Sequence, residues 1–181
     1  MDIIKTKSDF NIIIRQENSS DYSEVHELIC KAFATENCYD VADYFEEVRK
    51  KDTFIPELSF VAVSKDEKIV GQIALYETDI ITDEDRKTQL VLSPVCVLPE
   101  YFNRGIAREM IVFALDKAKE MGYAAVFLQG NPKFYEKFGF EPSYKYGIYH
   151  ENDKDKNADY CMINILAANG LDGITGITYY E

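Results

Sequence analysis

The first half of the chain alternates between short apolar runs typical of strands and apolar positions spaced as in helices. The β-branched run Ile12–Ile14 indicates a strand, and the polar stretch Asn18–Asp21 offers N-cap residues for the helix after it. Two apolar runs around the polar turn Ser64–Lys68 predict a β-hairpin. The elements predicted for this half are a strand at 12–14, helices at 25–33 and 41–48, and strands at 58–63 and 69–76.

The second half places a strand, a long helix and another strand in close succession. Thr88–Leu98 is nearly apolar throughout, as in a strand buried on both faces, and we interpret the charged stretch Asp79–Lys87 as a connection. The elements predicted next are a strand at 88–98, a helix at 105–121, a strand at 124–128, a helix at 134–138 and a strand at 160–166. The charged segment 151–159 and the glycines at 170, 173 and 176 are interpreted as turns. This order predicts an α/β fold with a mixed sheet.

The composition fits one folded domain. The chain has 181 residues, of which 46% are hydrophobic, so we expect a single domain over 1–181, with a core at 12–166 and a short extension at 167–181. No window approaches the roughly 20 apolar residues of a membrane span. The first residues lack a signal-peptide pattern. We therefore expect a cytoplasmic protein without a membrane partner.

The charge balance is strongly acidic. Twenty basic and 32 acidic side chains give a formal charge of −12. Nucleic acid is excluded as a general partner, because phosphate binding requires a basic face. The charge either keeps the chain soluble, which is the simpler explanation, or also attracts a cationic substrate such as an amine.

The cysteines and histidines do not have the spacing of a metal site. No two cysteines form a Cys-x-x-Cys pair, and only two histidines accompany them, so we predict no zinc or other metal. We expect reduced thiols, because disulfides are rare without an export signal. These residues are Cys30, Cys38, Cys96, Cys161, His26 and His150.

The segment Leu92–Ala107 has the pattern of an anion site. An apolar strand runs into a turn in which Gly105 and Ala107 open a helix. Small residues let the backbone approach a ligand closely, and the first N–H groups of a helix have no partner within it. These donors and the positive helix end suit a pyrophosphate. The segment is neither a P-loop nor a Rossmann fingerprint, because the spacing of both is missing.

Two motifs in this part of the chain resemble the GNAT N-acetyltransferase family, and specifically its YhbS-like branch. The family's acetyl-CoA loop reads Gln/Arg-x-x-Gly-x-Gly/Ala, which falls on Phe102–Ala107, with Phe102 departing from the usual Gln or Arg. Downstream, Asn131–Phe140 is similar to the family's later helix with its Tyr-x-x-x-Gly-Phe signature. The resemblance implies the GNAT acyl-CoA N-acyltransferase fold, with a central, mostly antiparallel sheet flanked by helices.

The resemblance also implies direct transfer of acetyl from acetyl-CoA to an amine of a small molecule or a protein. It places Tyr135 beside the cofactor sulfur, where the phenol protonates the departing thiolate; the alternative is that Tyr135 is only a core aromatic. The implied cofactor contacts are Val95, Cys96, Val97, Asn103, Arg104, Gly105, Ile106, Ala107, Arg108, Asn131 and Tyr135.

An amine nucleophile must be neutral, so a base or a water chain is required. Candidates are Glu77, Ser93 acting through water, and Glu36 or Glu46; for each, the alternative is a surface carboxylate or a strand hydroxyl. Cys96 as a covalent nucleophile is a further alternative, although no histidine is obviously placed to activate it.

Two other functions remain open at this point. The first is a non-catalytic sensor that binds acyl-CoA on the same fold, which the departure at Phe102 and the unassigned base leave open. The second, more distant, is a protein that binds a pyridine nucleotide or ATP. The sequence also leaves room for a homodimer.

Overall fold

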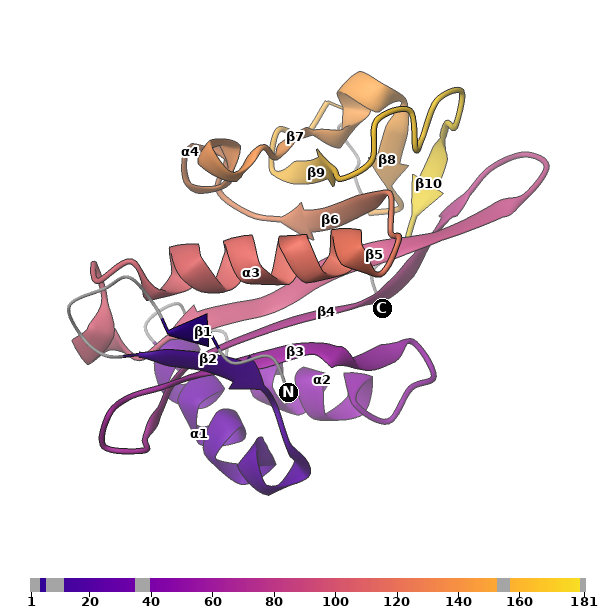
Figure 1. The fold of residues 1–181 in the computed structure, drawn as a ribbon. Coiled ribbons are helices and arrows are strands. Elements are labelled where there is room, and N and C mark those ends of the chain that lie inside the picture. Colours follow the sequence, from indigo (N-terminus) through magenta and orange to yellow (C-terminus); the bar gives the residue numbers. More distant parts are fainter. Residues whose placement is uncertain (1–3, 6–11, 35–39, 153–156, 180–181) are drawn as a thin grey trace. The chain divides into compact units, whose positions relative to one another are not determined.

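The computed structural model describes residues 4–5, 12–34, 40–152 and 157–179, and Figure 1 shows the course of the chain. Its strands and helices are β1 (Ile4–Lys5), β2 (Ile13–Gln16), α1 (Tyr22–Phe33), α2 (Asp40–Val48), β3 (Phe54–Val63), β4 (Ile69–Ile81), β5 (Arg86–Val97), α3 (Ile106–Glu120), β6 (Ala125–Gln129), α4 (Pro132–Tyr135), β7 (Glu141–Pro142), β8 (Ile148–His150), β9 (Cys161–Ile165) and β10 (Gly176–Thr178).

These elements form two compact units. The first is made of Met1–Leu75 with Ser93–Ala114, and the second of Tyr76–Leu92 with Leu115–Glu181. The strands are mostly antiparallel and helices flank them, so the predicted fold class is confirmed. The single-domain assignment stays a prediction.

In the first unit the strands follow the order β1-β2-β3-β4-β5. β2 and β3 are antiparallel, with residues 13–16 of β2 opposite residues 63–60 of β3. Helices α1 and α2 lie together on one side of these strands, and the start of α3 lies on the other (Figure 1). The buried positions of α1 are Val25, Leu28 and Ile29, which share one helical face as the sequence pattern predicts.

A buried ion pair fastens the helices of the first unit to its strands. Arg49, just after α2, donates to the carboxylate of Glu17, which also accepts the hydroxyl of Ser59 at 2.6 Å. The Arg49 guanidinium lies 4.2 Å from the ring centroids of both Tyr22 and Phe45. Burial raises the pKa of Glu17, and the positive charge of Arg49 opposes that rise. The pair therefore stabilises one arrangement of α1, α2 and β3.

In the second unit the strands follow the order β4-β5-β6-β9-β7, and β10 lies between β4 and β8. β5 and β6 run parallel, with Leu90 opposite Val126, while β6 and β9 run antiparallel over residues 125–129 and 165–161. The side-chain oxygen of Gln89 accepts the backbone N–H groups of residues 124 and 125, which holds the start of β6 against β5.

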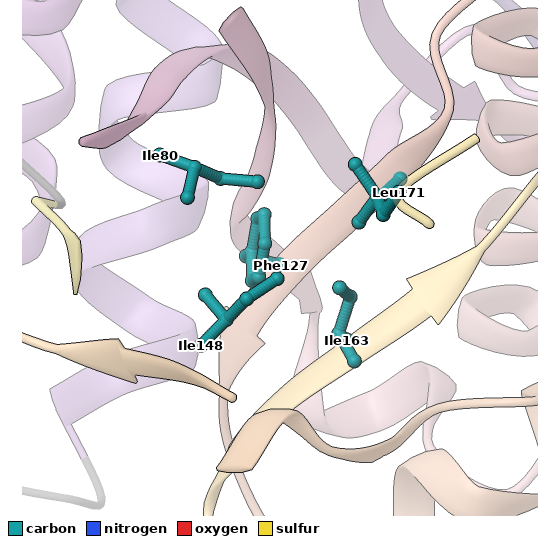
Figure 2. Close-up of a cluster of buried hydrophobic side chains, with 6 residues drawn as sticks. Ile80, Phe127, Ile148, Ile163 and Leu171 are labelled. Atoms are coloured by element: carbon teal, nitrogen blue, oxygen red, sulfur yellow. The ribbon is translucent and has the colours of Figure 1, made fainter. Parts of the chain in front are cut away.

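The core of the second unit draws on strands far apart in the sequence. Figure 2 shows Ile80 of β4, Phe127 of β6, Ile148 of β8 and Ile163 of β9 pointing toward one another, with Leu171 beside them. All except Leu171 are 0 to 1% exposed. Their burial joins β4 to the C-terminal strands, because apolar surface removed from water is the main favourable term in folding.

Two assignments in the second unit were wrong. The segment Asp79–Lys87 was predicted as a connection, but β4 continues to Ile81 and β5 begins at Arg86. The charged side chains pair across the two strands, where Asp79 accepts from Arg86 at 3.0 Å and from Thr88 at 2.8 Å. Gly176 was predicted in a turn and instead begins β10. Charges and glycines were taken as signs of loops, although charged side chains also pair across strands and glycine occurs in strands where another backbone comes close.

No helix in the described part of the chain is long and apolar enough to cross a membrane.

Candidate functional site

The first unit holds the segment that the sequence singled out, here called the glycine loop (residues 102–108). It follows β5 through a single 3-10 turn at Pro99–Tyr101 and ends in the first turn of α3. Gly105 has φ +79°, and a Cβ built on it would meet nothing within 4 Å. This backbone conformation favours glycine, and the space above it is open to a ligand.

The first turn of α3 supplies hydrogen-bond donors. The helix closes its first bond from the N–H of Glu109 to the carbonyl of Gly105 at 3.1 Å. The N–H groups of Ile106, Ala107 and Arg108 therefore precede the helical ladder, as at any helix start. These donors and the positive end of the helix dipole are the features that suit an anion such as a pyrophosphate.

Close packing fixes the start of α3 on the sheet. A Cβ on Gly71 of β4 would come within 3.0 Å of the Met110 sulfur and 3.2 Å of the Cys96 carbonyl oxygen. Ile106 and Met110 are buried on the same side of the helix. Gly71 thus allows the helix to approach the strands, a role that no motif in the sequence indicated.

The last residues of β5 have one open side and one packed side. Exposure alternates along this strand end: Ser93 and Val95 are half-buried, and Pro94 and Cys96 are buried. The Cys96 thiol interacts with the backbone of Gln72, and burial strongly raises its pKa. A buried thiol with a raised pKa is a poor nucleophile, so this geometry counts against the covalent alternative.

The flanks of the glycine loop differ in polarity. Arg104 lies over the ring of Tyr101, with its guanidinium carbon 4.9 Å from the centroid. Phe102, at the position where the family motif has Gln or Arg, is 51% exposed, and Asn103 has φ +60°. The loop therefore presents an apolar ring and a backbone cradle side by side.

The second unit holds the other predicted motif, here called the tyrosine helix (residues 131–138). Asn131 is its N-cap, and its side-chain oxygen accepts the N–H of Lys133 at 3.1 Å. The ring of Tyr135 packs edge-on against Phe134 and Phe140, with centroids 4.9 and 5.8 Å away. The predicted cofactor residue Asn131 thus has a structural role as a cap, and Tyr135 is half-buried among aromatics.

Two further residues support the tyrosine helix. A Cβ on Gly130 would lie 2.4 Å from the Tyr135 ring, so the ring rests on the backbone at Gly130. At the other end, the side chain of Asn164 donates to the Phe138 carbonyl at 2.7 Å, just before Gly139 in the left-handed conformation. Neither Gly130 nor Asn164 belongs to the motif, and only the fold reveals them.

The candidate bases are engaged in different contacts. The Tyr123 hydroxyl donates to the Glu77 carboxylate at 2.6 Å, and burial together with this bond raises the pKa of Tyr123. Glu46 pairs with Arg49 at 2.6 Å. Ser93 is half-buried on the open side of β5. Glu36 lies outside the described residues, as does Cys38.

The two histidines make contacts of their own. His26 on α1 lies 3.1 Å from the Asp43 carboxylate, and the ring of His150 accepts the N–H of Asn152 at 3.2 Å. Within the described ranges no group of three or more His, Cys, Asp and Glu is arranged to hold a metal ion.

Comparisons with known proteins agree with the two motifs. The family model of the acetyltransferase (GNAT) domain matches residues 13–143. The N-acetyltransferase YhbS of Escherichia coli, itself uncharacterized, is 28% identical over 171 residues, which are 94% of this chain and 96% of the relative.

Solved structures give the same result. The crystal structure of YhbS from Escherichia coli in complex with CoA has a TM-score of 0.84 and 26% identity, covering 97% of this chain and 93% of that one. A GNAT acetyltransferase from Brucella melitensis in complex with acetyl-CoA has a TM-score of 0.75 and 23% identity, covering 94% and 96%. The chain belongs to the GNAT acetyltransferase family.

Proposed function

We propose that the protein transfers an acetyl group from acetyl-CoA to a primary amine of a small molecule or a protein. The observation that carries the proposal is the glycine loop: an open Gly105 at φ +79° directly before three helix-start N–H groups. The residues present fit the coenzyme, because this cradle has donors for a diphosphate and no side chain over it at Gly105.

The glycine loop and the end of β5 hold different parts of the donor. The N–H groups of Ile106, Ala107 and Arg108 bind the pyrophosphate, and Arg104 and Asn103 lie at the rim of the loop. The backbone of Val95, Cys96 and Val97 contacts the pantetheine arm, since the open side of β5 lies at Ser93 and Val95. A backbone N–H at this strand end stabilises the charge that develops on the thioester oxygen. The exposed ring of Phe102 offers an apolar contact where the family has a polar one.

The transfer itself is a direct displacement. The amine nitrogen forms a bond to the carbonyl carbon of the donor, and the carbon–sulfur bond breaks. The Tyr135 hydroxyl gives its proton to the departing thiolate and regains one from solvent. The amine loses a proton to Glu77, or to solvent through a water chain in which Ser93 relays the proton. Holding amine and thioester together supplies much of the rate enhancement. The reaction needs no metal, and we place it in the cytoplasm, where cysteine thiols stay reduced.

Release of free thiol from acetyl-CoA across a panel of amines tests the proposal. We expect turnover with at least one amine, and we expect Tyr135→Phe to lower kcat by about 100-fold with the thermal midpoint unchanged. The rings around Tyr135 keep their packing in this variant, so folding is preserved. Tight CoA binding without turnover on any amine would instead support a non-catalytic acyl-CoA sensor.

A further inference from the structure

A hollow of about 950 Å³ lies in the second unit, and none of the residues that line it belongs to either motif. It is formed by the tip of the β4–β5 hairpin (residues 81–87), strands β8 and β10 with their flanking residues, and the segment 173–175; we call it the hairpin-tip hollow. All residues that line it belong to the second unit. None of them is among the residues assigned to acetyl transfer.

The floor of the hollow is an apolar row across three strands. Ile177 of β10 pairs with Ile81 of β4 on one side and with Tyr149 of β8 on the other. Because side chains alternate along a strand, the next row, Ile80 with Thr178, points the opposite way into the core. The same strands therefore bury one face, shown in Figure 2, and present the other to the hollow.

The floor leaves apolar and aromatic surface open to solvent. Ile177 is 42% exposed and Tyr179 is 39% exposed, and both line the hollow together with the half-buried Ile81 and Tyr149. Tyrosine is enriched among residues that dominate binding energy at interfaces. The row crosses three strands, which is about 10 Å at the strand spacing of ~4.8 Å, the length of roughly three residues of an extended peptide.

The rim of the hollow is acidic and held in shape. The Thr82 hydroxyl accepts the N–H groups of Glu84 and Asp85 at 3.3 and 2.9 Å, which fixes the turn. Lys87 pairs with Asp85 at 2.6 Å, whereas Asp83 and Glu84 make no ion pair within the described residues. Two uncompensated carboxylates thus stand beside an apolar floor.

We propose that the hairpin-tip hollow docks a basic, partly apolar peptide segment of another protein. Positive side chains of the segment meet Asp83 and Glu84, and an apolar side chain covers the row at Ile177. A second copy of this chain is a poor occupant, because each copy carries a formal charge of −12. The volume is at the upper end of small-ligand pockets, and the floor is an open strand surface that suits an extended segment. This docking does not depend on acetyl transfer.

Fluorescence anisotropy with a labelled nonapeptide of alternating lysine and leucine tests the charge part. We expect the double variant Asp83→Lys with Glu84→Lys to weaken binding about tenfold. The matched control is Asp66→Lys with Glu67→Lys, which makes the same change at the tip of the β3–β4 hairpin and is expected to change the Kd less than about twofold. Equal losses in both double variants would overturn the proposal, because attraction to the chain would then be unspecific.

The apolar contact between the peptide and Ile177 is tested by a separate variant. We expect Ile177→Ala to weaken the same peptide about threefold, while Val112→Ala, at a residue exposed to a similar degree on α3, leaves the Kd unchanged. A peptide of alternating lysine and glycine that binds equally well would overturn the apolar contact. Self-association that the Asp83 and Glu84 reversal abolishes, measured by sedimentation, would assign the hollow to a second copy and overturn the proposal.

Discussion

The glycine loop of the first unit and the tyrosine helix of the second present their functional groups by different means. The loop offers backbone N–H groups, and its geometry depends on the left-handed conformation of Gly105 and the start of α3. The tyrosine helix offers one side chain, which depends on the packing of Tyr135 between aromatic rings and over Gly130. The loop site thus depends on one backbone conformation, whereas the side-chain site depends on how one ring packs against its neighbours.

The largest effect is expected from a substitution in the glycine loop itself. Gly105→Val forces a branched residue into φ +79°, which costs about 1–2 kcal/mol, and fills the open space above the cradle. We expect the Kd for CoA, measured by calorimetry, to rise about 100-fold while kcat at saturating donor changes little.

Gly122→Val is the matched control for this substitution. Gly122 has φ +90° and equally open space, but it lies after the end of α3. We expect a similar loss of stability and an unchanged Kd for CoA. A Kd that rises equally in both variants would mean that the loop geometry has no direct part in binding.

A substitution at Gly130 tests the tyrosine helix in the same way. Gly130→Ala places a Cβ 2.4 Å from the Tyr135 ring, so the ring must move. We expect kcat to fall about tenfold and the Kd for CoA to stay within about twofold, because the effect is on positioning. Gly170→Ala is the control, since its Cβ would lie 2.6 Å from that of Ala124 and crowds the same unit elsewhere. If the control lowers kcat as much, the position of Tyr135 is not what limits turnover.

A smaller effect is expected at Cys96. Cys96→Ala removes a buried sulfur next to the strand end and should lower the free energy of unfolding by about 1 kcal/mol, measured by urea denaturation. Turnover should stay within about threefold of the native rate, because the burial that raises the pKa of the thiol also keeps it from attacking a thioester. An acetylated Cys96 peptide in mass spectra of the quenched reaction would contradict this expectation.

At Asp21 the expected effect is on the stability of the first unit only. Arg15 donates to both carboxylate oxygens of Asp21 at 2.6 and 2.9 Å, and these bonds lower the pKa of Asp21. A lowered pKa in the folded state stabilises the fold above the unfolded value of about 4, and this contribution is lost as the pH falls through the folded value. We expect Asp21→Asn to reduce the free energy of unfolding by about 1–2 kcal/mol at pH 7 and by less at pH 3. A loss that is the same at both values would rule out the carboxylate charge as its cause.

Local patterns explain how far the sequence alone predicts this protein. The glycine loop and the tyrosine helix were both found, because a helix start and a helix end carry their signals within a few residues. Helices 22–33 and 40–48 follow apolar spacing and were predicted within a few residues of their bounds. The β3–β4 hairpin was predicted at its turn, although β3 begins four residues earlier and β4 ends five residues later than expected.

Features that depend on contacts between distant residues were not found. Gly71 of β4 is required because Met110 of α3 packs on it, and no local pattern marks that contact. Asn164 of β9 is likewise recognised only by its bond to the Phe138 carbonyl. The strand ends on either side of the 82–85 turn were missed, because Asp79 and Arg86 resemble loop residues in the sequence although their side chains pair between β4 and β5. Strands β8 and β10, only three residues each, have too few positions to show a period.

The pairing of β10 with β4 also affects the order in which the chain can fold during its synthesis. A Cβ on Gly176 would lie 2.2 Å from the Ile81 carbonyl oxygen, so only glycine allows β10 to enter beside β4. Ribosomes make a chain from its N-terminus, and residues 176–178 leave the exit tunnel long after residues 80–81. Until β10 has emerged, the edge of β4 and the isoleucines in the core of the second unit stay exposed on the nascent chain. This segment is therefore where we expect chaperones to bind during synthesis.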